Sequence, residues 1–236
     1  MVKLMKYESR VEAGTILSEY IKDKNKDLYI QISQSPNEFF CYAIPNGGVP
    51  VSEGFCSQLN IYYDILIVRK LKIPSNTEAG FGAMTTDGTV LFNHLLLNQL
   101  NLTQKEIQNS IETTKEEIQN RIKYYSRELD IYKLYVKNIQ NKNIILLDDG
   151  LASGFTMLAG IKMIKSYNPK KIYIAVPTAP LRTIKRLENE VNEIFCPDIR
   201  NTLWFAVADA YQHWYDVPES EVLEMISKSK HYIVNI

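Results

Sequence analysis

A run of four apolar residues, Ile144–Leu147, is followed at once by two aspartates and a loop of small residues. Such an unbroken apolar run is typical of a strand buried on both faces, as in a parallel sheet covered by helices. Helix-length stretches at 157–167 and 180–190 flank a further short apolar run at 171–176. This alternation predicts parallel strands joined by helical crossovers. We therefore expect an α/β fold built on a doubly wound parallel sheet.

The residues before this run fit the same plan with additions. Apolar residues at helical spacing predict a helix over Tyr7–Lys22, and two apolar runs predict strands over Phe39–Ile44 and Tyr63–Val68. A stretch rich in Pro, Gly, Ser and Thr at 69–93 predicts a flexible loop with a hairpin, because Asp and Gly form a good two-residue turn within it. A long amphipathic helix is expected over 103–138.

Length and composition bound the function. The 236 residues suffice for one well-buried core, so we expect a single domain over 1–236 in which 69–93 and 103–138 are insertions. Lys plus Arg equals Asp plus Glu at 27 each, which argues against a nucleic-acid partner. Cys41, Cys56 and Cys196 lack metal-ligand spacing and fit a reduced cytoplasm. No apolar stretch predicts a leader or a membrane span, so we expect a cytoplasmic protein with no membrane partner.

The loop after the apolar run carries the chemistry. Ser153–Thr156 opens a helix, which offers unpaired backbone N–H groups and the positive end of the helix dipole to an anion. Gly154 lets the backbone approach closely, and Ser153 and Thr156 add hydroxyl donors. Several such bonds, each about 1.5–3 kcal/mol to a charged group, approach the about 8 kcal/mol of micromolar binding. The loop is therefore predicted to bind a phosphate group.

Asp148 and Asp149 precede this loop, and two carboxylates would repel a phosphate that touched them. They suit a hydroxylated or cationic group, and a ribose diol supplies two O–H donors. An interpretation in which the aspartates bind a sugar and the loop binds the phosphate of that sugar is therefore self-consistent. The alternative, a solvated strand end with a helix cap, is less favoured here because the buried strand and the Gly/Ser/Thr loop flank the pair. The Walker and dinucleotide-binding glycine patterns are absent.

This segment resembles the motif that binds 5-phosphoribosyl-1-pyrophosphate (PRPP) in the type I phosphoribosyltransferases. The resemblance implies that Asp148 and Asp149 hold the ribose 2- and 3-hydroxyls. It implies that the loop holds the 5′-phosphate through Ala152, Ser153, Gly154, Phe155 and Thr156. Phe155 stands where a small residue is common, which is tolerable if its side chain points away.

The resemblance is closest to the predicted phosphoribosyltransferases of unsettled substrate, and it runs in order across most of the chain. The matching segments are Arg10–Gly14, Ile44–Pro50, Val68–Leu71, Glu78–Ala83, Asp87–Thr89 and Val176–Pro180. It implies that Asn46, Gly47 and Gly48 contact pyrophosphate, although this group usually has Arg at position 46. A plain tight turn is the alternative for that loop.

Two cations belong to the same implied site. Arg69 and Lys70 would stand at the reacting centre, under a lid that excludes water, with surface solvation as the alternative for each side chain. Arg127 and Lys133 are weaker candidates of the same kind. The implied cofactor is Mg²⁺ bound with PRPP, through ligand oxygens and water rather than by protein side chains.

The implied reaction transfers the phosphoribosyl group from PRPP to a nitrogenous base and releases pyrophosphate. Ala152 stands where 6-oxopurine enzymes carry aspartate, so a hypoxanthine–guanine assignment loses support. A cluster near the C-terminus could stack on a base or simply pack the terminal segment: Tyr211, His213, Trp214 and Tyr215. A regulator that binds PRPP or a nucleotide without turnover is the main alternative, favoured by Asn46. An assembly protein that uses the long helix is a third. The resemblance is also compatible with a homodimer.

Overall fold

The computed structural model describes residues 6–74, 76–125 and 131–233. Its centre is a parallel sheet in the order β2-β1-β6-β7-β9. The strands are β1 (Phe39–Ala43), β2 (Tyr63–Ile65), β6 (Asn143–Leu147), β7 (Lys171–Ala175) and β9 (Glu193–Phe195). The expected α/β fold with a parallel central sheet is therefore confirmed.

Strand β6 lies in the middle of this sheet and is buried along its whole length. Ile145 and Leu147 pack with the helices on one face, α1 (Arg10–Lys24), α2 (Lys26–Gln34), α3 (Gly48–Leu59) and α9 (Glu219–Lys228). Ile144 and Ile174 pack on the other face with α6 (Ile131–Ile139) and α7 (Phe155–Ser166). Because neighbouring side chains of a strand point to opposite faces, a sheet covered on both sides requires the unbroken apolar run seen in the sequence.

The chain leaves the sheet in opposite directions from its two central strands. β1 continues through α3 to β2, whereas β6 continues through α7 to β7 and then through α8 (Leu181–Leu187) to β9. The strand order therefore reverses between β1 and β6, which pair in register from Phe39 opposite Asn143 to Ala43 opposite Leu147. Ligands of open α/β sheets bind beyond the carboxyl ends of strands at such a switch point.

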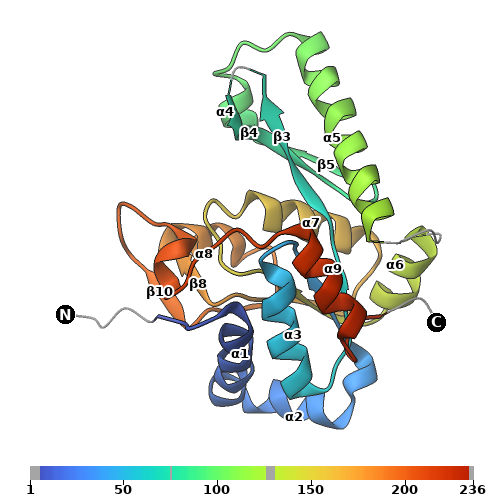
Figure 1. Cartoon of the computed structure of the whole chain (residues 1–236), viewed down its shortest axis with the longest axis vertical. Coiled ribbons are helices and arrows are strands. Elements are labelled where there is room, and N and C mark those ends of the chain that lie inside the picture. The colour runs from blue at the N-terminus through green and yellow to red at the C-terminus, as the bar shows by residue number, and fades with distance from the viewer. Residues whose placement is uncertain (1–5, 75, 126–130, 234–236) are drawn as a thin grey trace.

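A second, antiparallel sheet stands out from this body together with a long helix (Figure 1). It consists of β3 (Val68–Ile73), β4 (Asn76–Thr85) and β5 (Val90–Phe92), and the predicted Asp87–Gly88 turn joins the last two. The helices here are α4 (His94–Leu97) and α5 (Gln104–Tyr124). The helix expected over 103–138 corresponds to α5 and α6, and residues 126–130 between them lie outside the described residues.

The remaining elements are short. A small parallel sheet joins β8 (Thr178–Pro180) to β10 (Asp198–Arg200). Two short 3₁₀ turns are found at Pro36–Glu38 and Val207–Ala210. Within the ranges that the structure describes, no helix is both long and apolar enough to cross a membrane.

Candidate active site

The two loops that the sequence singled out lie against each other at the switch point. Pairing of β1 with β6 ends both strands at the same level, so Pro45–Gly48 and Asp148–Thr156 leave the sheet side by side. Gly47 is the point of closest approach: a Cβ atom there would lie 1.9 Å from Oδ2 of Asp149. Only glycine leaves room for the carboxylate at this distance.

One cleft of about 380 Å³ opens between these loops and strand β3. Its lining includes most of the charged residues predicted for the site, together with one cation that sequence reasoning missed, Lys72. The lining residues are Ile44, Pro45, Asn46, Gly47, Val68, Arg69, Lys70, Lys72, Asp148, Asp149 and Thr156. Acidic groups thus stand at one wall and cations at another.

The aspartates differ in their partners. Asp148 Oδ1 accepts the backbone N–H of Asp149 at 2.8 Å, while Asp149 Oδ2 accepts from Nε of Arg10 at 2.8 Å. Burial, followed by the negative charge of Asp149, raises the pKa of Asp148 well above its ordinary value. Burial also raises the pKa of Asp149, and the Arg10 guanidinium opposes that rise. Asp149 is therefore the carboxylate whose charge has a dedicated partner.

The phosphate loop enters α7 through Gly154, whose φ of 75° lies in the left-handed region. Gly154 at the N-cap has no side chain to cap the helix, and the N–H of Phe155 donates to Oγ of Ser153 at 3.4 Å. The first turn reaches the cleft at Thr156. Helix α8 fixes the loop from behind, because Thr183 donates to the carbonyl of Ala152 and Arg186 to that of Ser153. These bonds turn two carbonyl oxygens, which would repel an anion, toward α8.

The Phe155 ring lies near the same Arg186, whose guanidinium carbon is 5.9 Å from the ring centre. The ring thus contacts α8, while Thr156 lines the cleft. This arrangement removes the difficulty that a bulky residue in the phosphate loop would otherwise cause.

The cations of β3 share an acidic partner on α5. Glu117 accepts from Lys72 at 2.7 Å and lies 3.4 Å from Nε of Arg69. Although burial raises the pKa of Glu117, Lys72 and Arg69 together hold that pKa below its ordinary value. Lys70 is exposed at the cleft.

The side chain of Asn46 is engaged by protein groups rather than directed to the cleft alone. Its Oδ1 accepts from Arg121 of α5 at 2.9 Å, and its Nδ2 donates to the carbonyl of Val217 at 2.7 Å. Arg121 also pairs with Glu219 at 2.7 Å. The loop before α3 is therefore tied both to the long helix and to the C-terminal segment.

The structure places two of the other candidates, Lys133 and the aromatic cluster, and it adds Arg10. Of the weaker cation candidates, Arg127 lies outside the described residues, and Lys133 is exposed on α6 and absent from the cleft lining given above. The aromatic cluster does lie beside the acids, but Tyr211, Trp214 and Tyr215 surround the guanidinium of Arg10. The sequence contains a sign that Arg10 is unusual. Arg10 lies on the buried face of α1 one turn before Ala13, at a position where an apolar residue would be ordinary.

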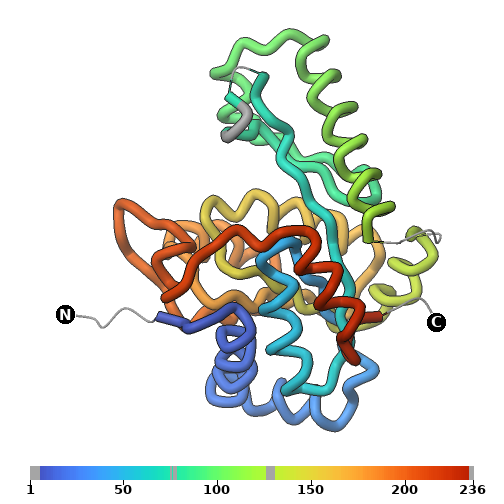
Figure 2. Tube along the Cα trace, viewed as in Figure 1, coloured from blue at the N-terminus to red at the C-terminus, as the bar shows by residue number. Residues whose placement is uncertain are grey.

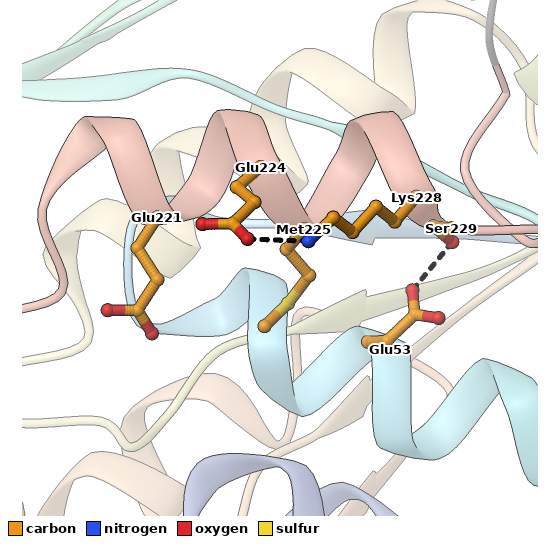
Figure 3. A pocket seen from close by; sticks show the side chains of 6 residues that line it. All are labelled: Glu53, Glu221, Glu224, Met225, Lys228 and Ser229. Atoms are coloured by element: carbon orange, nitrogen blue, oxygen red, sulfur yellow. Dashed lines mark hydrogen bonds and ion pairs between the residues drawn. The ribbon is translucent and has the colours of Figure 1, made fainter.

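A second hollow of about 420 Å³ lies between α3 and α9 and involves none of the predicted residues (Figure 3). Its polar side chains bind one another, since Ser229 donates to Glu53 at 2.6 Å and Lys228 to Glu224 at 2.6 Å. Among the described residues, no group of three or more His, Cys, Asp or Glu side chains is placed to hold a metal ion.

The comparisons with known proteins agree with this geometry. Residues 13–213 match the model of the phosphoribosyl transferase domain, so the chain belongs to that family, as the sequence resemblance predicted. A Mycobacterium tuberculosis protein provisionally named a phosphoribosyl transferase is 27% identical over 208 residues. That match covers 88% of this chain but 46% of the relative, so the chain spans about half the length of that curated protein.

Two further matches differ in their extent. A uracil phosphoribosyltransferase of Ureaplasma parvum is 32% identical over 69 residues, which is 28% of this chain and 33% of that enzyme. The crystal structure of the protein TT1426 from Thermus thermophilus superposes with a TM-score of 0.70 at 22% identity, covering 94% of this chain and 97% of that one. The last match establishes the shared fold.

Proposed function

We propose that this chain transfers the 5-phosphoribosyl group from PRPP to a nitrogenous base and releases pyrophosphate. The observation that carries the proposal is the cleft at the switch point, which the acid pair, Thr156 at the start of α7 and the cations of β3 line together. Each part suits a different part of PRPP. Membership of the phosphoribosyl transferase domain family supports the same conclusion.

In this proposal the backbone of Ala152–Thr156 binds the 5′-phosphate at the start of α7, and Asp148 and Asp149 accept the ribose hydroxyls. Within the loop Asn46–Gly48, the backbone N–H groups of Asn46 and Gly47 bind pyrophosphate, because the Gly48 N–H donates to the carbonyl of Ile44 at 3.1 Å. The Asn46 side chain is already bonded to Arg121 and Val217. Arg69 and Lys70 supply positive charge to the departing group. The bond from C1 to pyrophosphate breaks with its electron pair leaving on oxygen, and a ring nitrogen of the base forms the new bond.

Mg²⁺ is the proposed cofactor, bound together with PRPP. The donor set fits an ion held by ligand oxygens and water, since the cleft offers two adjacent carboxylates rather than a complete cage. When bound, the ion would offset charge on the pyrophosphate. Asp148 and Asp149 could orient its water shell, while positioning of the sugar depends on these side chains themselves.

A regulator that binds PRPP or a nucleotide without turnover is the second candidate. The observation that favours it is the Asn46 side chain, which is uncharged and is bonded to Arg121 and Val217, so it adds no positive charge for pyrophosphate. A binding measurement alone does not separate the two functions. Pyrophosphate release that depends on an added base separates them, because a regulator binds PRPP without releasing it.

The setting of the reaction is also proposed. The cysteines Cys41, Cys56 and Cys196 are buried free thiols, which supports a reduced cytoplasmic location. The expected partners are small molecules, PRPP and the base, and 1–236 is proposed to act as one functional domain. A homodimer remains a hypothesis that sedimentation equilibrium tests.

A further inference from the structure

Arg10 reaches the acid pair from a distant part of the sequence. Helix α1 packs closely on α3, where a Cβ atom at Gly14 would lie 2.0 Å from the carbonyl oxygen of Val51. Because α3 begins at the pyrophosphate-side loop, this contact brings the first turn of α1 to the cleft. Arg10 is buried there, with 5% of its side chain exposed, and its Nε donates to Asp149 Oδ2 at 2.8 Å.

An aromatic segment encloses the same guanidinium. Its carbon lies 4.3 Å from the ring centre of Trp214, 5.3 Å from that of Tyr211 and 5.4 Å from that of Tyr215. Tyr211 also donates its hydroxyl to the backbone carbonyl of Asp149 at 2.6 Å. Aromatic faces attract a guanidinium and hold its plane, so the arginine has little freedom to leave the carboxylate.

The N-terminal and C-terminal parts of the chain are joined at this point. Tyr7 forms a β-bridge with Tyr211. Figure 2 shows the blue N-terminal segment beside the orange-red segment of the C-terminal part. The hydroxyl of Tyr7 donates to the carbonyl of Pro177 at 2.9 Å. The segment that precedes Arg10 is therefore tied both to Tyr211 and to the loop after β7.

We propose that Arg10 is the positioning residue of the sugar site: it fixes the orientation and the charge of Asp149, and the segment Tyr211–Tyr215 fixes Arg10. This inference rests on the proposed function, in which Asp149 accepts a ribose hydroxyl. A planar guanidinium that donates from Nε directs one carboxylate oxygen away from the cleft and leaves the other for the ligand. An ionised carboxylate is also the better acceptor, and a neighbouring cation favours that form.

The test compares Arg10→Met and Arg10→Lys with Arg200→Met. Arg200 is a matched control, because it forms an ion pair of 2.7 Å with Asp198 at similar burial, lies near a phenylalanine ring, and belongs to neither half of the proposed cleft. The measurements are the melting temperature of each variant and calorimetric binding of PRPP with Mg²⁺ from pH 5.5 to 9. KM for PRPP and for the acceptor base follow where turnover is found.

Arg10→Met is expected to weaken PRPP binding at least tenfold at neutral pH. PRPP affinity is expected to rise with pH in both proteins, and in Arg10→Met this rise should occur at a higher pH than in the wild type. The titratable and charged groups near Asp149 are Asp148, Arg10 and Tyr211, and the cations of β3 line the same cleft. Arg10→Lys is expected to recover part of the affinity, since it keeps the charge. Arg200→Met is expected to lower the melting temperature while PRPP binding stays within about twofold.

The outcomes separate this inference from the function on which it rests. If wild-type protein binds no PRPP, the proposed function fails first, and the sugar-site role of Arg10 fails with it. If the wild type binds PRPP and folded Arg10→Met binds it equally well with the same pH dependence, the positioning role alone is wrong. Equal losses of affinity in Arg10→Met and Arg200→Met would show a merely structural effect and would also refute it.

Discussion

Replacing Gly47 by alanine places a methyl group where the Asp149 carboxylate lies. The new Cβ atom would stand 1.9 Å from Oδ2, whereas ordinary van der Waals contact begins at 3.4 Å, so the carboxylate must move away by at least the difference. Such a movement breaks the 2.8 Å bond to Arg10 or turns the other oxygen out of the cleft. The backbone of the loop itself has φ of −61° at Gly47, which alanine adopts without strain.

The expected effect is on ligand affinity rather than on folding. A hydroxyl bond to an ionised carboxylate contributes about 1.5–3 kcal/mol, and each 1.4 kcal/mol is a factor of ten, so loss of one bond raises Kd for PRPP about 10- to 150-fold. Calorimetric titration with PRPP and Mg²⁺ measures this change. The matched control is Gly160→Ala in α7, where the nearest atom to a Cβ is a flexible Leu66 methyl at 3.1 Å.

Gly160→Ala is expected to keep the wild-type Kd and melting temperature, because alanine is favourable inside a helix. The reasoning is refuted if Gly47→Ala, with a melting temperature close to that of the wild type, binds PRPP within twofold of wild-type affinity. That result would mean that Asp149 does not bind the sugar, or that the loops of Gly47 and Asp149 move apart without a loss of free energy.

Three further predictions concern the walls of the cleft. Burial and the charge of Asp149 raise the pKa of Asp148, so the folded state binds the Asp148 proton more tightly than the unfolded state does. The folded protein therefore loses stability as pH rises from about 4 through the raised pKa of Asp148. The melting temperature of Asp148→Asn should exceed that of the wild type by more at pH 8 than at pH 4.5, while PRPP binding is lost. A gain that is the same at both pH values would contradict this assignment. Asn46→Ala should lower the free energy of unfolding in urea by about 1–3 kcal/mol, because the partly buried hydrogen bonds of its side chain with Val217 and Arg121 are lost. A change below about 0.5 kcal/mol would count against this expectation. Lys70→Ala should keep the free energy of unfolding within about 0.5 kcal/mol of the wild type and should weaken PRPP binding in a salt-dependent way. The control Lys170→Ala, at the opposite end of the parallel strands, should leave PRPP binding unchanged. Equal affinities of Lys70→Ala and the wild type for PRPP would exclude Lys70 from the site.

Much of the central sheet could be predicted from the sequence because burial on both faces leaves a local mark. The apolar run Ile144–Leu147 predicted the strand that the structure has at Asn143–Leu147, and the strand predicted over Phe39–Ile44 is found at Phe39–Ala43. The two loops of the site follow these buried strands, and the carboxyl ends of neighbouring parallel strands meet at one edge of a sheet. The resemblance to the type I phosphoribosyltransferases predicted that both loops belong to one site, and the structure places the two loops side by side.

The projecting sheet was predicted less well. One strand was expected over Tyr63–Val68, but the chain leaves the central sheet after Ile65 and begins a new, antiparallel pairing at Val68. All six residues are buried, so the apolar pattern does not record where the strand changes its partner. The helix over Lys26–Gln34 was not predicted, because its buried residues Leu28 and Ile32 are too few to form a clear stripe.

The residues that support the site from outside could not be found by local pattern. Arg10 lies 139 positions from Asp149, and Arg121 lies 75 positions from Asn46, so both bonds depend on tertiary packing. A buried charge within a helical stripe is a local hint, but the sequence does not name its partner. The aromatic residues near the C-terminus were noticed as a group, yet only the fold places them around a guanidinium.

The most direct test of the account is pyrophosphate release from PRPP and Mg²⁺, measured against a panel of purine and pyrimidine bases. The control is the double variant Asp148→Asn with Asp149→Asn, with folding checked by its melting temperature. We expect release that depends on one base and disappears in the control. Binding of PRPP without release for any base would contradict the transferase and favour the regulator, and release that persists in the folded double variant would contradict the site itself.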